Sequence, residues 1–188
     1  MGRPHRSGIL LLAMLMSSMV AACAQPSGLR QSARPMTMEE AREFFTCRTL
    51  MSFDPGHGTQ IFYMRPDGTE FLWYPGNRVV LASKWKFEQR VPGAPQLGVD
   101  ICFQYGTDTY NPVTKQQGGK WECRAAQANA YRVTERATGD IFGLSRGLPF
   151  VLPRERTSLE ALQQQLRTLK PEEPARDADD PACRKQTS

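Results

Sequence analysis

Hydrophobic and polar residues alternate along the middle of the chain in the way that β-strands require. Two aromatic runs, 60–64 and 69–74, flank Arg65-Pro66-Asp67-Gly68. The proline presets the backbone for a turn and the glycine tolerates a positive φ, so this segment predicts a hairpin. A longer alternation from 79 to 88 predicts a third strand with one apolar face.

The alternation continues through a second half of the predicted sheet. Residues 99–105 form one strand and residues 120–126 a return strand, joined by a long polar connection at 107–119. We expect the stretch from Trp85 to Cys123 to form the closing half of an antiparallel sheet. Weaker apolar signals at 131–133 and 140–144 suggest two further strands.

Two capping boxes predict helices at the ends of the domain. Thr37 and Glu40 start a helix that we expect to reach about Thr49, and residues 157–160 start a second. Leucines mark one face of the second helix: Leu159, Leu162, Leu166 and Leu169. The fold class is therefore α+β, mainly antiparallel β. We expect a meander or half-barrel sheet with an N-terminal and a C-terminal flanking helix, forming a single domain over residues 37–169.

The first residues have the features of an export signal. Arg3, His5 and Arg6 precede an apolar run over residues 8–20, which is too short to span a bilayer. The run ends in Val20-Ala21-Ala22-Cys23, which resembles a bacterial lipobox. We therefore interpret 1–22 as a signal peptide, Cys23 as a lipidation site and 23–36 as a flexible tether. The alternative is ordinary cleavage after Ala24, which would release the protein into the periplasm or the medium.

This leader predicts location and one partner. The chain would be a cell-envelope lipoprotein, held to the membrane by an N-terminal lipid anchor. Ala24 rather than aspartate follows the cysteine, so we favour the outer membrane, with the domain facing the periplasm. Residues 170–188 are rich in proline and acidic residues and lack apolar periodicity, which predicts a disordered tail.

Charge argues against nucleic-acid binding. The 188 residues carry a net charge of +5 from 24 basic and 19 acidic residues. Removing Arg3 and Arg6 with the signal leaves 22 minus 19, or +3. These basic residues are scattered and form no block that would follow a phosphate backbone.

Four cysteines remain after the leader: Cys47, Cys102, Cys123 and Cys183. An even number in an exported chain predicts disulfides, although four cysteines allow three connectivities. Cys102 and Cys123 lie on strands that we expect to be neighbours, so we pair them. Cys47 and Cys183 then pair by elimination. A zinc site is disfavoured because no Cys-x-x-Cys is present and no histidine lies near these cysteines.

No set of residues predicts an active site. His57 lies between two glycines and is interpreted as a solvated loop residue. Asp100, Asp108 and Glu122 could approach one another near the hairpin, but such residues are usually solvated. We therefore expect no enzyme activity, no cofactor and no metal.

Aromatic residues offer the best candidate binding surface. Trp73, Tyr74 and Trp121 could line a groove, although aromatic residues more often fill the core of a small β domain.

Part of the chain resembles a family of small exported bacterial proteins of unknown function. The shared pattern runs from Tyr63 through Asp67-Gly68 and Trp85 to Cys102 and Cys123. The chain departs from it at Ser83, where the family usually has glycine. The resemblance implies a short meander or half-barrel and brings no catalytic residues.

These observations favour a non-enzymatic binding or structural module for an envelope protein or glycan. The alternative is a half-barrel carrier of a small hydrophobic ligand. An envelope hydrolase is the least supported hypothesis, because it requires two carboxylates facing each other across a cleft.

Overall fold

The computed structural model describes residues 34–171 and residue 183. The predictions for the signal peptide, for Cys23 and for most of the tether and tail lie outside this part. Among the described residues, no helix combines the length and the apolar character needed to cross a membrane.

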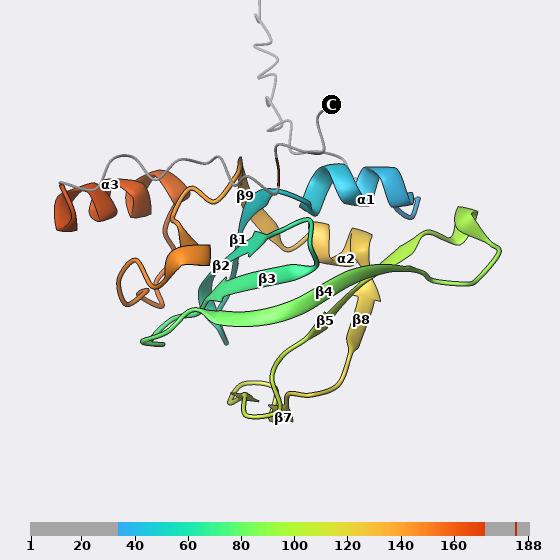
Figure 1. The fold of residues 1–188 in the computed structure, drawn as a ribbon, viewed down its shortest axis with the longest axis horizontal. Helices are drawn as coiled ribbons and strands as arrows, with labels where there is room; N and C mark the ends of the chain where they lie inside the picture. Colours follow the sequence, from blue (N-terminus) through green and yellow to red (C-terminus); the bar gives the residue numbers. More distant parts are fainter. Residues whose placement is uncertain (1–33, 172–182, 184–188) are drawn as a thin grey trace, which may run out of the picture. The chain divides into compact units, whose positions relative to one another are not determined.

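A curved antiparallel sheet forms the centre of the domain (Figure 1). Its order is β8-β5-β4-β3-β2-β1-β9, so β1 to β5 form a meander and β8 and β9 are the two edges. The strands are β1 (Arg48–Asp54), β2 (Gly58–Met64), β3 (Thr69–Trp73), β4 (Leu81–Gln89), β5 (Val99–Gln104), β8 (Glu122–Ala125) and β9 (Val133–Thr138). Two short strands, β6 (Tyr110–Asn111) and β7 (Gln116–Gln117), pair with each other in the β5–β8 connection.

The sheet curls into a half-barrel, and its connectivity explains why. The edge strands β8 and β9 are joined only by residues 126–132, which include helix α2 (Ala126–Ala130). In a flat sheet, strands spaced about 4.8 Å apart would separate these edges by about 29 Å. The connection spans only about 18 Å, because helical residues advance about 1.5 Å each. The two edges must therefore bend toward each other at this end.

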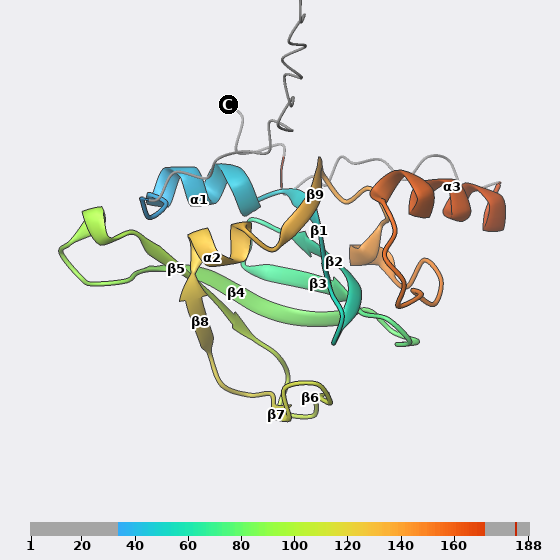
Figure 2. The same cartoon turned by 180° about the vertical axis from the view of Figure 1, so that it is seen from behind.

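Side chains alternate between two apolar cores on opposite faces of the sheet. On one face, Leu50, Met64, Trp85 and Ile101 pack with helix α1 (Met38–Phe45) and α2, and we call this the helix-side core. On the other face, Met51, Ile61, Tyr63 and Trp73 pack with the chain after β9. That chain includes helix α3 (Leu159–Leu169), and we call this second cluster the C-terminal core (Figure 2).

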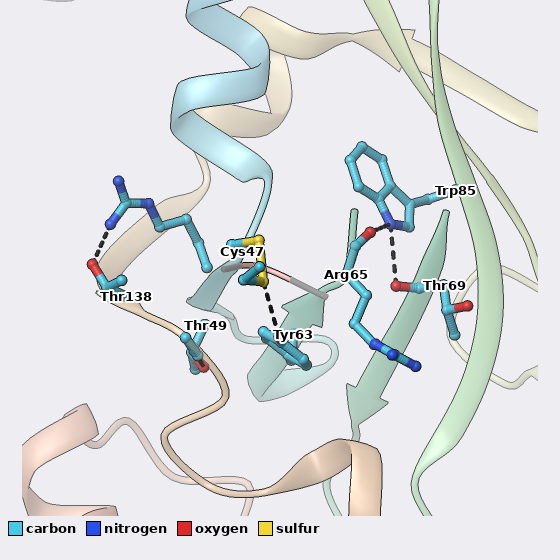
Figure 3. The surroundings of a disulfide bond; sticks show 10 residues. Cys47, Thr49, Tyr63, Arg65, Thr69, Trp85 and Thr138 are labelled. Carbon is cyan, nitrogen blue, oxygen red and sulfur yellow. Dashed lines mark hydrogen bonds between the residues drawn. A yellow bond between two sulfur atoms is a disulfide. The ribbon is translucent and has the colours of Figure 1, made fainter. Parts of the chain in front are cut away.

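Both predicted cysteine pairings are present. Cys102 and Cys123 are directly opposite each other on β5 and β8, and their sulfurs form a disulfide. Cys47, between α1 and β1, forms the second disulfide with Cys183 (Figure 3). The Tyr63 hydroxyl lies 3.4 Å from the Cys183 sulfur, so the residue sits beside the C-terminal core. Two disulfides fit an exported protein, because oxidising compartments preserve them.

The N-terminal helix is shorter than the sequence predicts. The capping box of Thr37 and Glu40 is present, but α1 ends at Phe45 and β1 begins at Arg48. Cys47 separates them with a φ of 57°, a left-handed conformation that a helix cannot continue through. Leu50 therefore packs from a strand. The sequence prediction missed β1 because its apolar residues also fit a helical stripe.

Three smaller corrections concern the C-terminal half. Helix α2 was not predicted. The predicted strand at 140–144 is a loop, because the Asp140 carboxylate accepts hydrogen bonds from the backbone of Leu144 and Ser145 and holds a tight turn. The α3 cap is Ser158, one residue later than expected, and its hydroxyl accepts from the Ala161 amide.

Candidate functional site

A cavity of about 830 Å³ continues from the helix-side core along the inner face of the half-barrel. We call it the inner cavity. Its apolar lining comes from α1, β1, β2, β5 and β9: Phe45, Leu50, Phe62, Met64, Phe103 and Val133. Its volume lies in the range of about 300–1,000 Å³ that is usual for small-molecule sites.

A smaller hollow of about 340 Å³, the side pocket, adjoins the inner cavity. The two share part of their lining: Gln60, Tyr105, Asn111, Gln116 and Glu122. Asn111 and Gln116 belong to the β6–β7 hairpin, so the polar 107–119 connection forms a wall of the site. Apolar side chains thus cover part of the cavity, while amides, hydroxyls and carboxylates occupy the rest.

Glu70 is the most unusual side chain in this lining. On β3 its side chain points to the opposite face from Phe71 and to the same inner face as Leu72. Its exposed fraction is 0%. The Ser83 hydroxyl donates to Glu70 Oε2 from the directly opposite position on β4. Glu70 Oε1 has no partner of good hydrogen-bond geometry among the described residues. Burial raises the pKa of Glu70 to about 7, against the lowering effect of Ser83 and Tyr105.

Tyr105, just beyond the end of β5, adds a hydroxyl beside this carboxyl. Burial and the neighbouring Glu70 raise the pKa of Tyr105 well above its usual value, and Glu122 raises it further. Its hydroxyl therefore stays protonated in the physiological range. Glu122 lies on the same inner face because it is directly opposite Phe103.

A second polar group lies near the β1–β2 turn. His57 Nδ1 is 2.9 Å from Asp54 Oδ2, and Nε2 is 3.5 Å from the Asn111 amide nitrogen. Burial opposes ionisation of Asp54, but hydrogen bonds from the His57 backbone and ring and from Gly56 hold its pKa below the usual value. The interpretation of His57 as a solvated loop residue was wrong, because its side chain is only 15% exposed. It orients toward the hairpin wall of the cavity.

The three residues of the candidate binding surface do not form one surface. Trp73 is fully buried in the C-terminal core, where its indole nitrogen donates to the Phe150 carbonyl at 2.9 Å. Trp121 is 38% exposed and lies under the Lys86 ammonium. Tyr74 lines the side pocket, and its buried hydroxyl has no hydrogen-bond partner among the described residues. Only Tyr74 therefore contributes to the cavities.

The candidate carboxylates are also separated. Asp100 alternates with Ile101 and so faces away from the cavity, where it accepts from the Arg90 guanidinium at 2.9 Å. Asp108 is exposed in the loop before β6. Glu122 is the one of the three that lines both hollows.

One group of side chains has the spacing of a metal site. Glu88, Cys102 and Cys123 place an oxygen and two sulfurs within 4.8 Å of one another. Both sulfurs form the disulfide, so neither is available as the thiolate that zinc would bind.

Glu70 and Tyr105 were missed as site residues at the sequence level. The sequence feature that could have identified Glu70 is an acidic residue within a largely apolar strand, on the same face as Leu72. Ser83, the departure from the family's usual glycine, is the residue that hydrogen-bonds this acid.

Comparisons of the chain with protein families, curated proteins and solved structures found no match. The resemblance to a family of small exported proteins stays a prediction.

Proposed function

We propose that the protein is an exported cell-envelope protein that binds a small ligand in the inner cavity. The observation that carries this proposal is a cavity of small-molecule size that contains a fully buried, incompletely paired carboxyl group, Glu70. Perturbed titratable groups in a mainly pre-formed pocket are a common feature of binding sites.

The lining supports a small amphipathic ligand more than a partner protein. Apolar residues such as Phe62 and Phe103 suit a hydrophobic body, while Gln60, Tyr105 and Glu122 suit a polar group. The 107–119 connection contributes side chains to this lining. We therefore prefer the half-barrel carrier over the module for an envelope protein or glycan.

The envelope location in this proposal rests on the leader. Arg3, the apolar run of residues 8–20 and Cys23 indicate export and lipidation. The two disulfides agree with an oxidising compartment. An outer-membrane anchor would hold the cavity close to the envelope's pool of small amphipathic compounds.

Blocking the cavity tests the proposal. Gln60 lines both hollows, so Gln60→Trp would fill the space that a ligand needs. Gln165→Trp, on the exposed side of α3, is a matched control. The purified mature protein would be incubated with a small-molecule extract of bacterial envelopes and analysed by native mass spectrometry. We expect an adduct on the wild type and on the control, and none on Gln60→Trp. An adduct of equal abundance on all three, or none on the wild type, would contradict the proposal.

A further inference from the structure

One carboxylate oxygen in the lining of the inner cavity, Glu70 Oε1, can accept a further hydrogen bond. Glu70 is fully buried, and Ser83 accounts for Oε2 only. Oε1 has no partner of good hydrogen-bond geometry among the described residues, although a buried polar atom without one costs about 1–3 kcal/mol. The side chain is among the residues that line the cavity, although it is not exposed to water, so a ligand would contact it after a small movement of neighbouring side chains.

The polar groups nearest to Glu70 are two neutral hydroxyls. Ser83 on β4 donates to Oε2, and the hydroxyl of Tyr105, just beyond the end of β5, interacts with the carboxyl group. Glu122 on β8 raises the pKa of Tyr105 and adds a second carboxylate to the lining. The other charged or titratable groups of this lining are Asp54, His57, Arg124, Tyr131, Arg132 and Arg156.

The arginines differ from Glu70 in their exposure. Arg124, Arg132 and Arg156 are all exposed, so water screens their charges, whereas Glu70 is not reached by water. None of them is among the groups that shift the pKa of Glu70. An ammonium group brought beside Oε1 would therefore meet a carboxyl group whose neighbouring donors are neutral hydroxyls rather than a positive charge.

We propose that the inner cavity selects ligands that carry an ammonium group, which donates a hydrogen bond to Glu70 Oε1 while the apolar body packs on Phe62 and Phe103. This inference rests on the proposed function and names its ligand class. The aromatic lining adds to the selection, because ring faces attract cations. An anion would face two carboxylates, and a neutral hydroxyl would give a weaker hydrogen bond than a charged donor.

The proposal requires a pH dependence of definite sign. Glu70 must be ionised to pair with an ammonium group, and the ammonium stays protonated through neutral pH because amine pKa values lie near 10. Since the pKa of Glu70 is about 7 before binding, affinity rises as the pH increases through 7 and levels off above it. Ligands that accept a hydrogen bond from the protonated acid would show the opposite trend.

Three probes of matched shape test the inference: phenethylammonium, 2-phenylethanol and 3-phenylpropionate. Isothermal titration of the full mature protein at about pH 8 should give an affinity for phenethylammonium at least about tenfold higher than for either other probe. At about pH 5.5 the affinity for phenethylammonium should fall at least about fivefold.

Variants separate recognition from a merely structural role. Glu70→Gln should lower the affinity for phenethylammonium by about tenfold or more and change that for 2-phenylethanol less than about twofold. Glu160→Gln, on exposed α3, should have no effect. Ser83→Ala removes a donor that lowers the pKa of Glu70, so the pH midpoint of phenethylammonium binding should move upward.

Each other outcome overturns the inference. Equal binding of the three probes, tighter binding of 3-phenylpropionate, or an unchanged affinity in Glu70→Gln would do so. If a neutral or anionic probe binds and Gln60→Trp abolishes its binding, the proposed function survives without the ammonium preference. If no probe binds and the envelope extract gives no adduct, both fail.

Discussion

Glu70 and Ser83 lie directly opposite each other on β3 and β4, and the serine hydroxyl donates to the glutamate inside the curved sheet. The pairing places a titratable group in the wall of the inner cavity rather than in solvent. Burial raises its pKa from the usual 4.5 to about 7. The stability of the domain must therefore depend on the protonation of this one side chain.

Glu70→Gln should remove a pH dependence of stability. The folded protein binds one more proton than the unfolded chain between pH 4.5 and about 7, so the free energy of unfolding falls as the pH rises through this window. The total loss is about 3 kcal/mol, at about 1.4 kcal/mol for each unit of pKa. Urea unfolding between about pH 4.5 and 8 should show this decline in the wild type and in Glu160→Gln, but not in Glu70→Gln. An equal slope in all three would contradict the buried acid.

Loss of the Cys102–Cys123 disulfide should destabilise the domain substantially. The bond closes a loop of 21 residues in sequence, which corresponds to about 3 kcal/mol in the chain-entropy model. The double variant Cys102→Ala/Cys123→Ala should therefore lower the free energy of unfolding by about this amount in urea titrations. The wild type, measured with and without reductant, is the control. A decrease of less than about 1 kcal/mol in the free energy of unfolding of the double variant would contradict the estimate.

The backbone at Cys47 predicts an unusual order of two variants. Its φ of 57° is unfavourable for any residue with a Cβ atom, and glycine adopts it freely. With the disulfide removed in both, Cys47→Gly/Cys183→Ser should be more stable than Cys47→Ala/Cys183→Ser by about 1 kcal/mol. Thermal unfolding would measure the difference. Greater stability of the alanine variant would show that the junction between α1 and β1 relaxes.

The different positions of Trp73 and Trp121 predict opposite costs of truncation. Trp73→Ala should destabilise the fold by about 3–5 kcal/mol, because it removes a fully buried indole that packs edge-on against Phe142 and Phe150. Trp121→Ala removes a half-exposed ring under Lys86 and should cost about 1 kcal/mol or less. Urea unfolding checks both, and acrylamide should quench the fluorescence of the wild type more than that of Trp121→Ala. Similar costs for the two variants would be inconsistent with the two cores.

The sequence predicted most of the fold because its strongest signals are local. The turn at Arg65–Gly68 and the capping box of Thr37 and Glu40 act over a few residues, and both formed as expected. The alternation in 79–88 became a strand that begins at Leu81, and α3 is capped by Ser158 in place of the predicted capping box. The Cys102–Cys123 disulfide followed from strand order, and the Cys47–Cys183 disulfide followed by elimination. The sequence prediction failed at Cys47, whose left-handed backbone ends the helix, and at Asp140, whose side chain accepts hydrogen bonds from the next turn of the chain.

The site was less predictable for a related reason. Glu70, Ser83 and Tyr105 belong to three separate segments of the chain, and only the pairing of β3 with β4 and the path of the chain after β5 bring them together. Trp73 and Tyr74 are adjacent in sequence, yet the alternation sends the first into a core and leaves the second at a pocket. The face that each strand buries cannot be read where both faces are apolar.

Helix α2 has a consequence for binding energetics. Because it connects the two outermost strands by so short a path, the half-barrel cannot open out without losing this helix. The curvature is therefore retained before a ligand arrives, and little chain entropy is lost when it binds. Such preorganisation favours rapid association with only side-chain adjustments, and backbone amide exchange rates in β8 and β9 should scarcely change on complex formation.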